Sequence, residues 1–202
     1  MPQAAATDTL RRYQSVAATK ASGETYTPKE LSDFVAHHIC RCFDFDSREA
    51  INILDPSIGD GQLSISLLDE IRKVYKGKIE LFAFDTNAAA LAMARDRLER
   101  RHADCILHFE NKDFLKFVID GDREPDLLSL QTDQDKPSFD LIIANPPYVR
   151  TQIMGANEAQ RLATTFGLMG RVDLYQAFLL AMAKVLAPHG AAGFIISNRF
   201  MT

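Results

Sequence analysis

The chain has 202 residues, of which 47% are hydrophobic and 25% charged, and its formal net charge is −4. These values are typical of one globular domain. No apolar run approaches the length of a bilayer span and the first residues lack a signal-peptide core, so we expect a cytoplasmic protein. Cys40, Cys42 and Cys105 form neither a disulfide framework nor a metal set, and His37-His38 has no further ligand at metal spacing. The sequence therefore predicts no metal.

The N-terminal part divides into a polar arm and a first helix. Residues 1–22 are rich in Ala, Thr and Gln, and they are expected to form an arm or helix ahead of one catalytic domain at 23–202. Pro28 is expected to be the first residue of the next helix, with Thr27 as its cap. The predicted buried stripe of that helix consists of Leu31, Phe34, Val35 and Ile39.

A strand, a glycine turn and a helix follow. Ile51-Asn52-Ile53-Leu54 is a short apolar strand, and Asp55-Pro56-Ser57-Ile58-Gly59-Asp60-Gly61 leads from it into a helical pattern. Gly59 and Gly61 allow the backbone to approach a ligand, and the helix N-terminus supplies unpaired N–H groups. The third glycine and the lysine of dinucleotide and P-loop sites are missing, and a purely structural turn is at least as common.

The next two strands each end near an acidic residue. The run Ile79 to Phe84 ends at Asp85, and an acid at the tip of the second strand of an open α/β sheet is suited to binding ribose hydroxyls. The run Cys105 to Phe109 leads to Asp113-Phe114, where the carboxylate can accept from an adenine amine while the ring packs on the base. Each acid taken singly is also common as a helix cap.

The fourth strand, Phe139 to Ala144, runs into Asn145-Pro146-Pro147-Tyr148. A Pro-Pro step cannot continue a strand because it donates no backbone hydrogen bonds, and Pro147 holds Pro146 extended. The Asn145 amide and the Pro146 carbonyl then offer two acceptors beside the Tyr148 ring, which matches the planar exocyclic amine of a nucleobase. The alternative interpretation is a strand-ending turn with a buried Asn cap.

The remaining segments are connections and a final unit of helix and strand. The polar stretch Asp120 to Ser138 is expected to be a surface excursion. The glycine-containing stretch Arg150 to Arg171 is expected to be irregular, either a lid, a DNA-facing loop or a simple crossover. A helix is expected at Asp173 to Leu186, followed by a last strand at Ala192 to Ser197.

These motifs lie in order at the carboxyl ends of four successive strands, where ligands of such sheets bind. From Gly23 onward the chain resembles the S-adenosylmethionine-dependent, adenine-specific (N6) DNA methyltransferases of the type I and type IIG restriction-modification kind. The resemblance implies a Rossmann-like α/β fold, with a mostly parallel central sheet flanked by helices, and S-adenosyl-L-methionine as the cofactor. The segments Gly170 to Tyr175 and Phe194 to Phe200 are also similar to this family.

The resemblance assigns roles to individual residues. In the cofactor loop, Ser57, Ile58 and Asp60 differ from the residues usual in the family, whereas both glycines are kept. The implied cofactor-binding residues are Tyr26, Thr27, Pro28, Asp55, Pro56, Ser57, Gly59, Gly61, Asp85, Thr86, Asp113, Phe114 and Asn145. The implied catalytic residues are Asn145, Pro146, Pro147 and Tyr148.

The activity that the resemblance implies is methyl transfer to the N6 amine of a flipped adenine in DNA, within a restriction-modification system. The same motif also suits a protein glutamine or an RNA base, and a non-catalytic cofactor-binding subunit is a further alternative. No cysteine lies near the end of the fourth strand, which excludes a C5-cytosine mechanism.

The net charge of −4 is unfavourable for binding DNA phosphates. Family members continue with further strands and a target-recognition domain, so we expect a chain truncated before the last strands and not necessarily active alone. Contact with double-stranded DNA is then expected from a missing target-recognition domain or a separate specificity subunit. A restriction nuclease, fused or separate, is a further expected partner.

Overall fold

A computed structural model describes residues 27–121, 138–147, 156–168 and 173–196. Its centre is a five-stranded sheet in the order β3-β2-β1-β4-β5, in which every neighbouring pair is parallel. The strands are β1 (Ala50–Asp55), β2 (Lys78–Phe84), β3 (Ile106–Glu110), β4 (Phe139–Ala144) and β5 (Leu186–Phe194). The predicted Rossmann-like fold with a parallel sheet is therefore confirmed.

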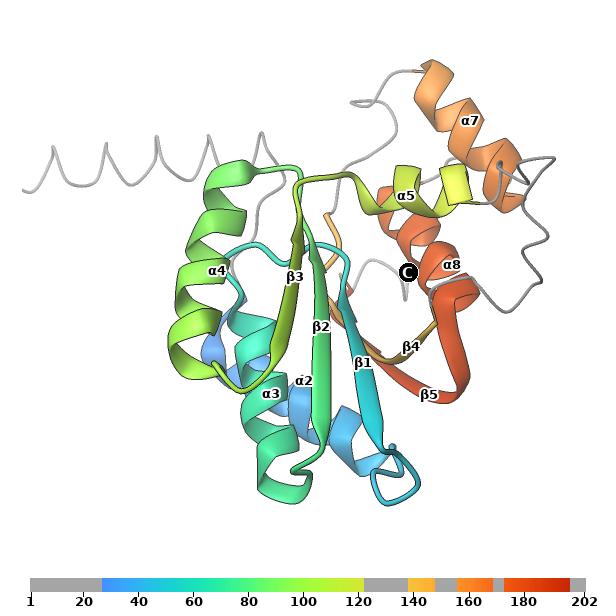
Figure 1. Ribbon diagram of the computed structural model, residues 1–202. Helices are drawn as coiled ribbons and strands as arrows, with labels where there is room; N and C mark the ends of the chain where they lie inside the picture. Colours follow the sequence, from blue (N-terminus) through green and yellow to red (C-terminus); the bar gives the residue numbers. More distant parts are fainter. Residues whose placement is uncertain (1–26, 122–137, 148–155, 169–172, 197–202) are drawn as a thin grey trace, which may run out of the picture.

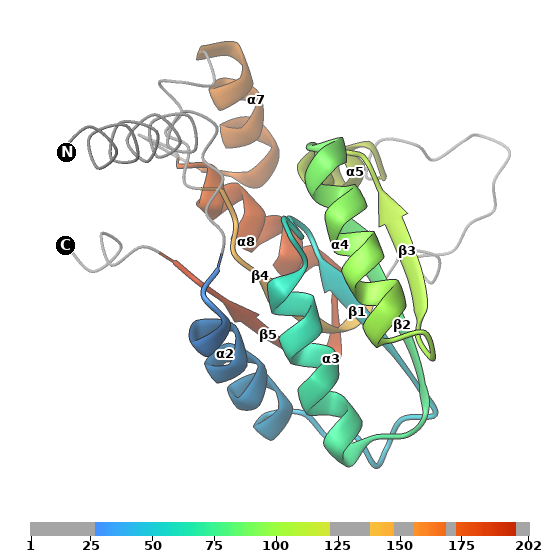
Figure 2. The same cartoon turned by 90° about the vertical axis from the view of Figure 1, so that its left-hand side faces the viewer.

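Helices cover both faces of the sheet, as Figures 1 and 2 show. One face carries α2 (Lys29–Arg41), α3 (Gln62–Val74) and α4 (Ala88–Arg101). The other carries α5 (Phe114–Gly121) and α8 (Leu174–Val185), with α7 (Ala156–Phe166) beside α8. Among the described helices, none combines the length and the apolar character that a membrane crossing requires.

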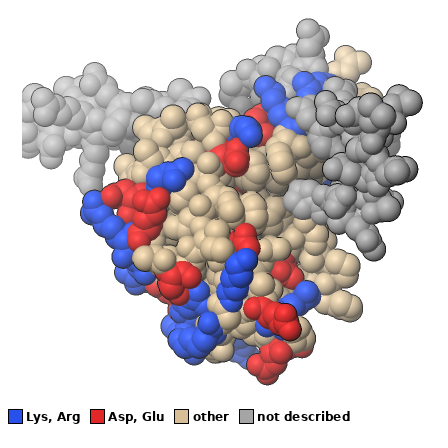
Figure 3. All heavy atoms as spheres, in the orientation of Figure 1, with Lys and Arg blue, Asp and Glu red and all other residues tan. Residues whose placement is uncertain are grey.

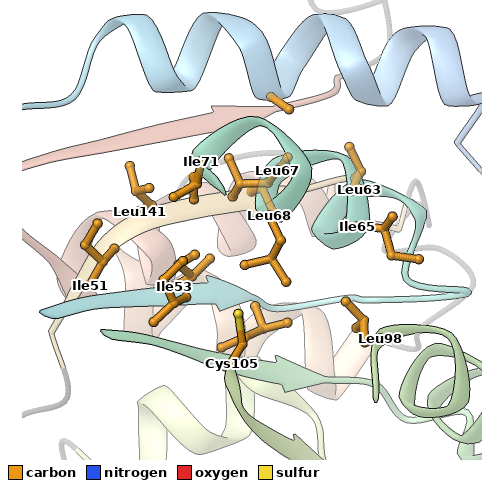
Figure 4. Close-up of a cluster of buried hydrophobic side chains, with 14 of the residues drawn as sticks. Ile51, Ile53, Leu63, Ile65, Leu67, Leu68, Ile71, Leu98, Cys105 and Leu141 are labelled. Carbon is orange, nitrogen blue, oxygen red and sulfur yellow. The ribbon is translucent and has the colours of Figure 1, made fainter. Parts of the chain in front are cut away.

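The strands divide their side chains between two cores. Ile51 and Ile53 of β1 point into the cluster under α3, which Figure 4 shows, whereas Leu54 points into the cluster under α5 and α8. In β4, Leu141 likewise points into the cluster under α3, and Ile142 points into the cluster under α5 and α8. Successive strand residues face opposite sides, so a strand covered on both faces is mostly apolar. This explains why the sequences of β1, β2 and β4 are mostly apolar, although they include Asn52, Glu80 and Asp140 respectively.

The start of α2 differs from the sequence-based prediction. The helix begins at Lys29, and Pro28 is the preceding cap residue with an extended ψ of 144°, so Thr27 does not cap the helix. The buried stripe is also shifted: Leu31 and Phe34 are 39% and 61% exposed. The buried residues of α2 are Ser32, Ala36 and Ile39. The helix packs against both α3 and β5, and a Cβ on Gly193 of β5 would collide with the Ile39 side chain, so this glycine allows the close approach.

The C-terminal part also differs from the prediction. A helix, α7, occupies much of the stretch from Arg150 to Arg171 that was expected to be irregular. The last strand begins at Leu186, well before Ala192, and includes Pro188 and Gly190. Its register against β4 shifts between Phe139 and Leu141. In the described sheet β5 is an edge strand, and an edge tolerates both a proline and such an irregularity.

The predicted arm at residues 1–22 lies outside the described residues, as do Tyr26 and Tyr148. The boundary of the catalytic domain at residue 23 therefore stays a prediction.

Candidate cofactor and catalytic site

The glycine loop joins β1 to α3 with two residues in the left-handed backbone region. Gly59 has φ +55° and Gly61 has φ +82°. A Cβ on Gly61 would lie 3.1 Å from the Ala94 Cβ, so this glycine lets the loop pack closely on α4. A Cβ on Gly59 would meet no atom within 4 Å. The loop therefore presents bare backbone to open space at Gly59, which suits close approach of a ligand.

Asp85, at the end of β2, ties the second strand to this loop. Its Oδ2 accepts a hydrogen bond from the Gly59 N–H at 2.8 Å, and its Oδ1 accepts from the Asn87 N–H at 2.8 Å. A carboxylate has about four acceptor positions. Asp85 can thus fix the loop and still accept ribose hydroxyls, while the neighbouring Thr86 is exposed at the same edge.

Asp55 lies beneath the loop with no exposed surface. Its Oδ2 accepts from the Ser64 hydroxyl at 2.6 Å and its Oδ1 accepts from the Ser57 N–H at 3.3 Å. Burial raises the pKa of Asp55 to about 7, although the Ser64 hydrogen bond opposes that change. The adjoining Pro56 is buried as well. In this structure Asp55 holds the loop from inside, and a direct contact with the cofactor stays a prediction.

Arg97 of α4 is a loop contact that the sequence analysis missed. Its Nη1 lies 2.7 Å from both the Asp60 carboxylate and the Asp60 carbonyl, and its Nη2 donates to Gln62 Oε1 at 2.6 Å. Asp60 is one of the loop residues that differ from those usual in the family. The guanidinium neutralises the added carboxylate and holds the turn. No local pattern marks this contact, because Arg97 lies 37 residues from Asp60 in the sequence.

The residues after β4 adjoin the same loop. Asn145 is half-buried and Pro146 is buried. The Ser57 hydroxyl donates to the Asn145 carbonyl at 3.2 Å, and the Asn145 Nδ2 donates to the Thr27 Oγ1 at 3.0 Å. The structure thus brings together three motifs that the sequence analysis identified separately: the segment before α2, the glycine loop and the Asn-Pro-Pro turn.

Asp113 and Phe114 stand at the start of α5. Asp113 Oδ1 accepts from the Leu115 N–H at 2.9 Å, so one of its oxygens caps the helix. The Phe114 side chain is 1% exposed, with its ring 5.6 Å from that of Phe84 and 6.0 Å from that of Phe178. Both residues therefore have structural contacts, and the predicted adenine contact remains a prediction.

One group of potential metal ligands occurs among the described residues, in the connection between α4 and β3. The donor atoms of His102, Asp104 and Cys105 lie within 4.8 Å of one another. The Arg72 guanidinium is 2.8 Å from Asp104 and donates to the Cys105 sulfur at 3.4 Å. The Arg72 cation thus already contacts two of the three potential ligands, and a second positive charge beside it would be repelled.

Acidic and basic side chains are interspersed on the face that Figure 3 shows. The arginines of α4 each pair with a carboxylate. The pairs are Arg95–Glu99, Arg97–Asp60, Arg100–Asp96 and Arg101–Asp69. Paired arginines have less charge to offer DNA phosphates, which agrees with the net charge of −4.

Comparisons with known proteins add family information to this geometry. A family model described as the Eco57I restriction-modification methylase matches residues 62–202. The type II methyltransferase M.BanIII of Aneurinibacillus aneurinilyticus is 40% identical over 186 residues, which cover 90% of this chain and 31% of the relative. A release factor glutamine methyltransferase of Caulobacter vibrioides is 27% identical over 173 residues, covering 81% of this chain and 50% of that protein.

Among solved structures, the type IIG restriction endonuclease BpuSI is similar with a TM-score of 0.65 and 17% identity, over 88% of this chain and 20% of its own. That likeness concerns the fold. The chain spans about a third of the length of M.BanIII. S-adenosylmethionine, the predicted cofactor, is the methyl donor of the matched family. The family prediction is confirmed: the chain belongs to the Eco57I restriction-modification methylases.

Proposed function

We propose that this chain is the cofactor-binding and catalytic part of a site-specific DNA methyltransferase, which methylates the exocyclic N6 amine of adenine as part of a restriction-modification system. The observation that carries the proposal is the hydrogen bond from the Ser57 hydroxyl to the Asn145 carbonyl. It joins the glycine loop to the Asn-Pro-Pro turn, so a methyl donor on the loop and an amine at the turn would be neighbours.

The residues at the loop fit S-adenosylmethionine, which supplies an electrophilic methyl group when bound. Gly59 has open space beside its backbone, and Asp85 has acceptor capacity left for ribose hydroxyls. Asp113 stands at the next strand end with one oxygen engaged in the helix cap. We assign the loop to the methionine and ribose parts of the cofactor, and Asp113 with Phe114 to its adenine.

The chemistry follows from the target amine. The lone pair of the N6 nitrogen is delocalised into the ring, so the enzyme must localise that pair to make it nucleophilic. Hydrogen bonds from the amine to the Asn145 side chain and to the Pro146 carbonyl favour a tetrahedral nitrogen. They strengthen as positive charge develops on the nitrogen during transfer. Neither group is a base at neutral pH, so the proton leaves to solvent afterwards.

Access to the amine requires a flipped base, which costs a few kcal/mol in a duplex. We assign Tyr148 to stacking on the flipped adenine, a contact worth about 1–3 kcal/mol. Because the arginines of α4 are already paired, we assign most of the grip on DNA to a target-recognition domain or a specificity subunit. A restriction nuclease, fused or separate, is a further proposed partner, and action on DNA implies a cytoplasmic enzyme.

A glutamine side chain presents a similar planar amide, and the release factor glutamine methyltransferase shares 27% identity with this chain. The 40% identity to a type II methyltransferase favours DNA. To test the proposal, the full-length protein is incubated with isotope-labelled cofactor and either duplex DNA, RNA or a glutamine-containing protein substrate, and the products are analysed by mass spectrometry. We expect N6-methyladenine from DNA. Label confined to RNA or to glutamine would refute the proposal.

A further inference from the structure

Within the part of the chain that the structure describes, hydrogen bonds reach Asn145 from two different segments. Its backbone carbonyl accepts from the Ser57 hydroxyl at 3.2 Å, and its side-chain Nδ2 donates to the Thr27 Oγ1 at 3.0 Å. Thr27 lies 118 residues earlier in the sequence, just before α2. One bond therefore fixes the backbone of Asn145, and the other fixes its side chain.

We propose that Thr27 is a positioning residue that sets the direction of the Asn145 amide; the inference rests on the proposed function. An amide group has a donor end and an acceptor end, and a target amine requires the acceptor end. With Nδ2 bonded to Thr27, the Oδ1 atom is the end directed away from Thr27. A reversed amide would bring its own N–H groups toward the N–H groups of the target and would lose the hydrogen bond on which the chemistry depends.

The residue that follows Thr27 is anchored to α2 by hydrogen bonds. Pro28 stands at the helix cap with φ −56°. The Pro28 carbonyl accepts from both the Ser32 N–H at 3.0 Å and the Ser32 hydroxyl at 3.1 Å. Ser32 is fully buried, whereas Pro28 is exposed, so the anchor is sheltered from water on the Ser32 side. Thr27 itself is β-branched, which restricts its χ1 rotamers. The anchored backbone and the restricted rotamers limit the positions of the Thr27 hydroxyl, which suits it to orienting the Asn145 amide.

The role predicted for Thr27 from the family resemblance was contact with the cofactor, and the two roles make different predictions. A cofactor contact affects the dissociation constant of the cofactor. A positioning role affects the methyl-transfer step at saturating cofactor, and it acts only when Asn145 is present. The Thr27 hydroxyl has one donor and two acceptor positions, so the two roles do not exclude each other.

The test uses the full-length protein with Thr27→Val, which keeps the shape and removes the hydroxyl, and Thr27→Ser, which keeps the hydroxyl. Single-turnover methylation of an adenine-containing duplex is measured at saturating cofactor and DNA. Losing one positioning hydrogen bond should slow transfer by roughly 10-fold. We expect Thr27→Val to show that loss and Thr27→Ser to recover most of it. Full activity in Thr27→Val would overturn the inference.

A double-mutant cycle separates positioning from a merely structural effect. In an Asn145→Ala background, Thr27→Val should cause no further slowing, because the side chain on which Thr27 acts is gone. An equal loss in both backgrounds, or a loss confined to the cofactor dissociation constant, would contradict the positioning role. If the wild-type enzyme methylates a different amine, the proposed substrate is wrong, and the same cycle run on that amine still tests Thr27.

Discussion

Replacing Asp55 by Asn should change how the stability of this protein depends on pH. The Asp55 carboxyl has no exposed surface, and its burial raises its pKa in the folded protein to about 7. In the unfolded chain an aspartate titrates near pH 4. Between these two values the folded state keeps a proton that the unfolded state has lost. The contribution of Asp55 to the free energy of unfolding is therefore fully present below about pH 4, and it is lost as the pH rises to about 7.

The size of the effect follows from the two pKa values. Each unit of difference corresponds to about 1.4 kcal/mol, so three units give at most roughly 4 kcal/mol between pH 4 and pH 7. Asn does not titrate. Its side chain can accept from the Ser57 N–H and donate to the Ser64 hydroxyl, in place of the contacts that Asp55 makes. Relative to wild type, Asp55→Asn should gain stability as the pH increases over this range.

Urea unfolding of both proteins at several pH values between 4 and 8 measures this difference. Ser64→Ala serves as a second variant, because it removes the hydrogen bond that favours the charged carboxylate. It should raise the pKa of Asp55 further and extend the fall in stability to higher pH. Parallel stability curves for wild type and Asp55→Asn would refute the reasoning, because Asp55 would then titrate alike in the folded and unfolded states.

Three further predictions concern the loop. Arg97→Met should raise the cofactor dissociation constant roughly 3- to 10-fold in calorimetric titration, because the turn loses its clamp, whereas Arg100→Met on the same helix should not. Gly61→Ala should lower the free energy of unfolding by roughly 2–3 kcal/mol and Gly59→Ala by about 1–2, since only the former adds a tight contact with Ala94 to the backbone strain; equal losses in urea unfolding would contradict this. Asp85→Ala should weaken cofactor binding, with turnover partly recovered at saturating cofactor, and an unchanged dissociation constant would argue against its role.

The sequence predicted the central elements of the fold well because these strands are buried on both faces. β4 was predicted with its observed bounds, since all six of its residues are buried and apolar except Asp140. The C-terminal elements were less predictable. α7 lies in a glycine-containing stretch whose composition is typical of a loop. β5 contains Pro188 and Gly190, which are typical of a turn but which an edge strand tolerates.

The positions of the site motifs were predictable because the carboxyl ends of parallel strands meet at one edge of the sheet. The contacts between them were not. The Thr27–Asn145 hydrogen bond and the Arg97–Asp60 pair join residues far apart in the chain, and no local pattern encodes such a pairing. The same limitation explains the error in α2, where Phe34 has helical spacing for a core position and yet is 61% exposed.

The most direct test of the central claim is single-turnover methylation by Asn145→Ala in the full-length protein, at saturating cofactor and duplex DNA. Asn145 supplies an acceptor whose hydrogen bond strengthens in the transition state, so by analogy with single oxyanion-hole donors we expect a loss of roughly 10²–10³-fold in the transfer rate. The cofactor dissociation constant should change far less than the rate. Wild-type transfer in this variant would contradict the account.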